Sequence, residues 1–78
     1  MSLREKLADL QHQLWSGWTQ WFFQCGTQNP DGSITIPADL VARWQRQIAT
    51  PYSELSPGEQ DSDRLEADKV LQVIKEHQ

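Results

Sequence analysis

The chain has 78 residues and a formal net charge of −4, and 37% of its residues are hydrophobic. A chain of this length forms one domain, over residues 1–78, and is too small to hold both a catalytic centre and a deep substrate cleft. Its apolar runs are too short for a membrane span, and its N-terminus does not resemble a signal peptide. The single cysteine, Cys25, excludes an internal disulfide framework and favours a reducing, cytoplasmic location.

The negative charge is confined to the last third of the sequence. Residues 1–53 are neutral overall, whereas residues 54–78 hold seven acidic side chains against three basic ones. No segment has the basic character that binding to duplex nucleic acid requires. A local arginine site nevertheless remains compatible with an acidic total.

The first predicted helix covers about residues 3–24. Ser2 and Glu5 have the spacing of a capping box, and Gly26 is a plausible stop. An apolar stripe then recurs every three or four residues, at Leu3, Leu7, Leu10, Leu14, Trp18, Trp21 and Cys25. Trp15, Phe22 and Phe23 lie outside this stripe, so the second half of the helix is apolar almost all round. It needs a second covering surface, from another subunit or a ligand, and we therefore expect a homo-oligomer.

A turn and a second helix follow. Asn29–Gly32 has the composition of a tight turn, and the β-branched segment 33–36 is expected to be extended. Pro37 suits the first position of a helix that ends at Thr50, before Pro51. Its apolar face consists of Leu40, Val41, Trp44 and Ile48.

The third helix is expected from Pro57 to near the end of the chain. Ser56, Pro57 and Glu59 form the strongest helix-start signal in the sequence, and the preceding connector should fold back through Tyr52 and Leu55. The apolar face of this helix contains Ala67, Val70, Leu71 and Ile74. One turn earlier the same face carries Asp63, which is expected either to be a paired, buried carboxylate or to contact a ligand. The expected fold is therefore mainly all-α: a compact three-helix domain with a turn and extended insert between helices 1 and 2.

No arrangement of residues predicts catalysis, a metal site or a cofactor. His12, His77 and Cys25 are scattered rather than spaced as metal ligands. His12 and Cys25 would lie about 20 Å apart on one continuous helix, which excludes a nucleophile–base pair. Cys25 is better interpreted as a small buried thiol on the apolar stripe. We expect a protein that is not an enzyme.

Aromatic and arginine side chains instead predict a small binding site. Aromatic planes stack on nucleobases, and guanidinium groups bind phosphates through two hydrogen bonds. The alternatives are core packing for the tryptophans and surface pairing for the arginines. The candidates are His12, Trp15, Phe22, Tyr52, Arg43, Arg46, Asp63 and Arg64.

Two stretches resemble a known family. His12-Gln13-Leu14-Trp15 is similar to the His-x-x-Trp of the ryanodine-receptor repeat (RyR) domain, and Pro51–Leu55, Glu59 and Ser62-Asp63-Arg64 resemble its Pro-Tyr-x-x-Leu…Glu-x-x-x-Asp-Arg segment. The chain also resembles short phage- and prophage-encoded proteins with a Trp-x-x-Trp helix and a Tyr-x-Glu-Leu…Ser-Asp-Arg-x-x-Ala-Asp-Lys tail. The Asp31–Pro37 turn stands in place of the Gly-Trp-x-Tyr-Gly segment of the RyR repeat.

The resemblance implies a small helical module that is not an enzyme. Bacterial and phage members of this kind suggest sensing or sequestration of a nucleotide-derived signal of antiphage defence, here in the host cytoplasm. We therefore expect binding of a small anionic nucleotide ligand by a phage sponge. The alternative is a protein-interaction module: a small phage regulator whose acidic third helix docks on a host protein.

Overall fold

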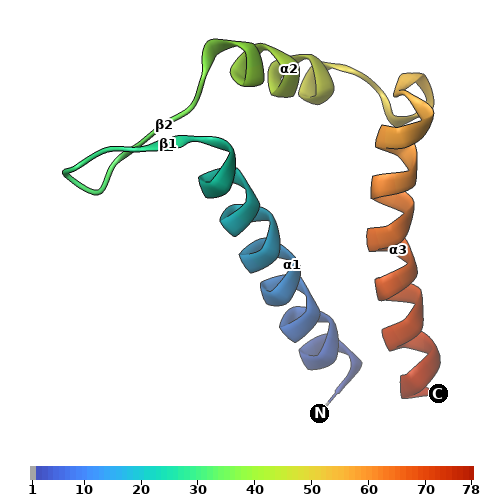
Figure 1. Ribbon diagram of the computed structural model, residues 1–78. Helices are drawn as coiled ribbons and strands as arrows, with labels where there is room; N and C mark the ends of the chain where they lie inside the picture. Colours follow the sequence, from blue (N-terminus) through green and yellow to red (C-terminus); the bar gives the residue numbers. More distant parts are fainter. Residues whose placement is uncertain (1) are drawn as a thin grey trace.

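The computed structural model describes residues 2–78 and is built from three helices and one short hairpin (Figure 1). Helix α1 spans Leu3–Cys25, α2 spans Ala38–Ala49 and α3 spans Pro57–His77. Strands β1 (Thr27–Gln28) and β2 (Ile34–Thr35) lie between α1 and α2, and a 3-10 turn, η1, covers Tyr52–Glu54. The predicted order of three helices with an insert after the first is confirmed. None of the helices in residues 2–78 combines the length and hydrophobicity that a bilayer crossing requires.

Side-chain caps explain where the two long helices begin. Ser2 Oγ accepts a hydrogen bond from the Glu5 amide at 3.2 Å at the start of α1. At α3 both halves of the capping box form: Ser56 Oγ accepts from the Glu59 amide, and Glu59 accepts from the Ser56 amide. Pro37 lies one residue before α2, as its N-cap, rather than at the first helical position.

The insert is a hairpin in which β1 pairs antiparallel with β2, Thr27 opposite Thr35. The Gly32 amide donates to the Asn29 carbonyl at 3.0 Å, and Gly32 has a φ of 90°, a conformation that favours glycine. The predicted turn and extended segment are confirmed. The pairing of Thr27–Gln28 was not predicted, because two polar residues carry no strand pattern.

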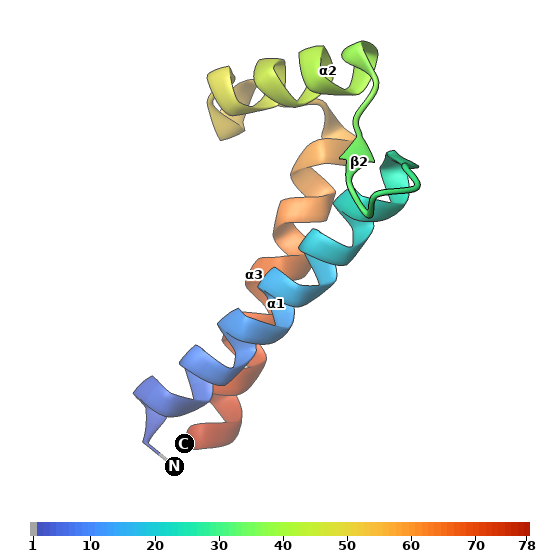
Figure 2. The same cartoon turned by 90° about the vertical axis from the view of Figure 1, so that its left-hand side faces the viewer.

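Helices α1 and α3 run side by side in opposite directions, and both chain ends lie at the same end of the pair (Figures 1 and 2). We call this the closed end, residues 3–13 and 70–77. There Lys6 Nζ lies 3.3 Å from His77 Nδ1, and Leu10 and Val73 are half-buried. At the other end α2 crosses above the pair and is joined to α1 through the hairpin (Figure 1).

The described chain is open rather than close-packed. Its Cα radius of gyration is 15.9 Å, against about 11.5 Å for a compact domain of this length. Its Cα extents are 46, 35 and 16 Å, so the described chain is flat rather than spherical.

Core packing, the alternative interpretation of the tryptophans, is not achieved within the single chain. Among residues 2–78 no side chain is fully buried, and Trp18 and Trp21 are 38% and 42% exposed. Ile48 of the expected α2 face is 86% exposed, and Leu71 of the expected α3 face is 62% exposed. The helix faces were predicted correctly as apolar, but the three helices of the open chain do not cover them.

Candidate binding site

Four aromatic rings gather where α1 passes beneath α2. Phe22 meets Trp44 edge to face, with ring centroids 4.8 Å apart, and Trp21 lies 5.3 Å from Phe22 and 5.9 Å from Trp44. Trp18 joins them, 5.8 Å from Trp21. These separations are those of favourable aromatic pairs. The rings join α1 to α2, but about two fifths of the surface of Trp18 and of Trp21 stays accessible.

A wide concavity opens beside these rings, bounded by α1, α2 and the first half of α3. We call it the hollow. Its volume is about 1210 Å³, larger than the range of about 300–1,000 Å³ typical of small-ligand pockets. Its walls carry Arg43 and Lys69 against Glu59, Asp63 and Glu66, so they hold more negative than positive charge. This balance does not favour a small anion.

Tyr52 and Arg64 meet outside the hollow, at the corner where η1 leads into α3. The Arg64 guanidinium carbon lies 6.0 Å from the centre of the Tyr52 ring. Arg64 donates to Asp61 at 2.8 Å and to Gln60 at 3.3 Å, and Gln60 donates to the Tyr52 carbonyl at 2.9 Å. The hydrogen bond to Asp61 is the main cause of a raised Arg64 pKa, followed by the interaction with Tyr52. We call these four residues the corner.

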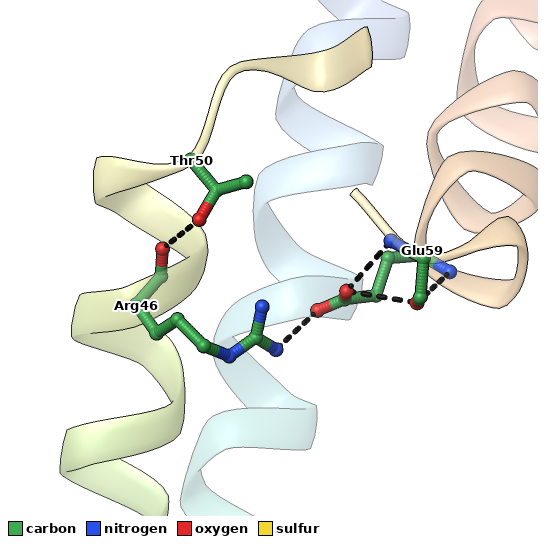
Figure 3. A network of polar contacts seen from close by, with 4 residues as sticks. Arg46, Thr50 and Glu59 are labelled. Carbon is green, nitrogen blue, oxygen red and sulfur yellow. Dashed lines mark hydrogen bonds and ion pairs between the residues drawn. The ribbon is translucent and has the colours of Figure 1, made fainter. Parts of the chain in front are cut away.

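Arg46 does not face a ligand site but joins α2 to α3. It donates to Glu59 Oε2 at 2.9 Å, while Thr50 Oγ1 donates to the Arg46 carbonyl (Figure 3). Hydrogen bonding from Ser56, and then from Arg46, lowers the pKa of Glu59 to about 2. The sequence analysis predicted a capping role for Glu59. Its pairing with Arg46 could not be predicted, because the pairing depends on how the connector between α2 and α3 turns.

His12 and Trp15 form a separate, exposed pair on α1. Their rings stack with centroids 6.1 Å apart, and Trp15 is 59% exposed. Neither lines the hollow. The predicted residues thus divide among several places: Phe22, Arg43 and Asp63 in the hollow, Tyr52 and Arg64 at the corner, His12 and Trp15 on α1, and Arg46 at the α2–α3 joint.

The expectation that Asp63 is a paired, buried carboxylate was wrong. Asp63 is exposed on the wall of the hollow and makes no hydrogen bond or ion pair with any other residue in 2–78. Water therefore solvates it in the single chain. Glu66, one turn later, bonds Lys69 through Oε1 at 3.1 Å, while its Oε2 is buried without a partner among the described residues.

Gln60, Asp61 and Glu66 are site residues that the sequence analysis missed. Spacings of three and four residues on one helix, Asp61–Arg64 and Gln60–Arg64, were the signal that could have found the first two. Within residues 2–78 no group of His, Cys, Asp and Glu side chains is arranged to hold a metal ion. Cys25 is half-buried at the end of α1.

Comparison with protein-family models, with curated protein sequences and with solved structures finds no match to this chain.

Proposed function

We propose that the protein binds a small anionic molecule derived from a nucleotide, without catalysis, at the corner. The observation that carries the proposal is the exposed pair of Tyr52 and Arg64. Their ring and guanidinium lie 6.0 Å apart, with Tyr52 46% and the Arg64 side chain 56% exposed. A ring for a nucleobase and a fork of donors for a phosphate are therefore accessible together.

The ion pair between Asp61 and Arg64 does not prevent a phosphate from binding Arg64. This ion pair lies at the surface, where such pairs contribute about 0–1 kcal/mol. A phosphate that accepts two hydrogen bonds from the guanidinium can replace a single carboxylate contact. Gln60 holds the Tyr52 backbone in place from α3, so the ring and the arginine stay together during this exchange.

The proposed biological role is sequestration of a defence signal by a phage-encoded protein in the host cytoplasm. This part rests on the resemblance to phage proteins and to the RyR domain, whose matched segment contains Tyr52 and Arg64. Sequestration requires tight binding only, which agrees with a site made of one ring, one guanidinium and two polar partners. A homo-oligomer belongs to the same proposal, as the unit that carries several such corners.

The direct test is a ligand screen on the full chain with cyclic di- and trinucleotides and ADP-ribose. A ligand present at a hundred times its Kd should stabilise the protein by about 2.7 kcal/mol, visible as a raised Tm. We expect Arg64→Ala to lose at least tenfold in affinity without lowering the Tm of the free protein. Arg4→Ala, on α1, is the matched control and should bind as the parent does. Absence of any shift with all these ligands would contradict the proposal.

A second candidate is a protein-interaction module, a small phage regulator whose acidic third helix docks on a basic host protein. Residues 54–78 hold seven acidic side chains against three basic ones, and Asp68 is exposed on α3. A host protein recovered by the chain and lost with Asp68→Lys, together with a silent ligand screen, would establish this alternative.

A further inference from the structure

We infer that a second copy of this chain fills the hollow, forming a two-fold symmetric dimer in which Arg43 of each copy pairs with Asp63 of the other. The inference stands apart from the proposed ligand site, because Tyr52 and Arg64 do not line the hollow.

The exposed area of the chain is the first argument. A compact protein of this mass exposes about 4,900 Å², whereas the chain exposes 6219 Å². The excess is about 1,300 Å² per chain, which two copies could bury as about 2,600 Å². That value lies in the range of about 2,000–5,000 Å² found for obligate homodimers.

The uncovered apolar faces are the second argument. Domains bury such faces between packed elements, and this chain leaves those of α1 and α2 exposed around the hollow. A second copy supplies the same kind of face, as the self-complementary contact of a two-fold dimer requires. The rings of Trp18 and Trp21 and the side chain of Ile48 would then be covered.

Charge on the walls of the hollow is the third argument. Arg43 and Asp63 both line it, yet neither forms an ion pair within residues 2–78. Both side chains are exposed, so a partner can reach them. Two-fold symmetry makes each cation–carboxylate contact occur twice, so one arrangement pairs both arginines with both aspartates.

Gly17 supplies a fourth, independent observation. It lies mid-helix on the wall of the hollow, where glycine weakens a helix relative to alanine. Nothing in the same chain approaches within 4 Å of the position that a Cβ would take. The absence of a side chain lets the backbone of the partner helix come close.

Sedimentation equilibrium of the full chain tests the dimer. We expect twice the chain mass of 9.0 kDa, and at least tenfold weaker association for Arg43→Glu and for Asp63→Arg alone. The double variant R43E/D63R should restore association, because the pair is exchanged rather than lost. Arg4→Glu, outside the hollow, is the control and should leave association unchanged.

The inference would be overturned by a monomer at every concentration, by dimerisation that Arg43→Glu leaves unchanged, or by a double variant without rescue. Circular dichroism of each variant shows whether its helices persist, and rescue in the double variant separates a charge effect from failure to fold. Gly17→Ala adds a further readout. It should weaken association, whereas a raised Tm with unchanged association would place Gly17 on a free face and overturn the assignment.

Discussion

The two ends of the α1–α3 pair differ in what holds them. At the closed end, Leu10 and Val73 are half-buried and Lys6 reaches His77, so one chain covers part of its own apolar stripe, although Leu71 is exposed. Around the hollow, larger side chains are left exposed, Trp18, Trp21 and Phe22 among them. The end with the smaller side chains is partly covered within one chain, while the end with the larger rings needs a second surface.

The largest effect should come from the rings of the hollow. Trp44→Ala removes the ring that joins α2 to Phe22 and Trp21, and it should lower the free energy of unfolding by about 3 kcal/mol. Urea denaturation measures this. Trp15→Ala, which changes an exposed tryptophan outside the hollow, is the control and should cost less than about 1 kcal/mol. Equal losses of unfolding free energy for Trp44→Ala and Trp15→Ala would contradict a distinct role for the rings of the hollow.

Truncation of one aliphatic side chain at each end tests how well each end is covered. Leu10→Ala at the closed end should cost about 2 kcal/mol, because that side chain packs within the chain. Ile48→Ala on the hollow should cost about 1 kcal/mol if a second copy covers it, although Ile48 is 86% exposed in the single chain. A change within about 0.5 kcal/mol for Ile48→Ala would show that this wall faces solvent.

The hairpin sets the path from α1 to α2 and can be disrupted at Gly26. A Cβ there would meet the Ile34 side chain and lie 2.9 Å from the Thr35 carbonyl oxygen. Gly26→Ala should therefore cost about 1–3 kcal/mol, through a shift of β2 against β1. Thr27→Ala, at the next and exposed position, should change unfolding by less than about 0.5 kcal/mol. A tolerated Gly26→Ala would show that the hairpin is not held tightly.

Acid should weaken the joint between α2 and α3. The Glu59 pKa is lowered from 4.5 to about 2. The contribution of ionised Glu59 to the free energy of unfolding is therefore complete above pH 4.5 and is lost as the pH falls through about 2. Urea midpoints measured across that interval should fall more for the parent than for Glu59→Gln. The substitution of Glu5, the first-turn carboxylate of α1, by Gln should leave the parent's pH dependence in place. A parent and Glu59→Gln with the same acid response would contradict the role of this pair.

The sequence predicted the helices well because their signals are local. Caps at Ser2 and Ser56, the turn at Gly32 and the stop before Pro51 depend on neighbours within four residues. The surroundings of Asp63 were not predictable, since periodicity places it on the apolar face but does not say whether that face is covered. The separate positions of Arg46 and Arg64 were also not predictable, because the path of the connector between α2 and α3 determines them. The connector turns Arg64 toward Tyr52 and brings Arg46 to Glu59.

The account depends most on what occupies the hollow. Isotope-filtered NOE spectra of a sample that mixes labelled and unlabelled copies test this directly. We expect NOEs between copies that connect the ring protons of Trp18 and Trp21 to the partner's half of the hollow. Spectra in which these rings show contacts only within their own chain, at a concentration where the protein is fully associated, would contradict the account.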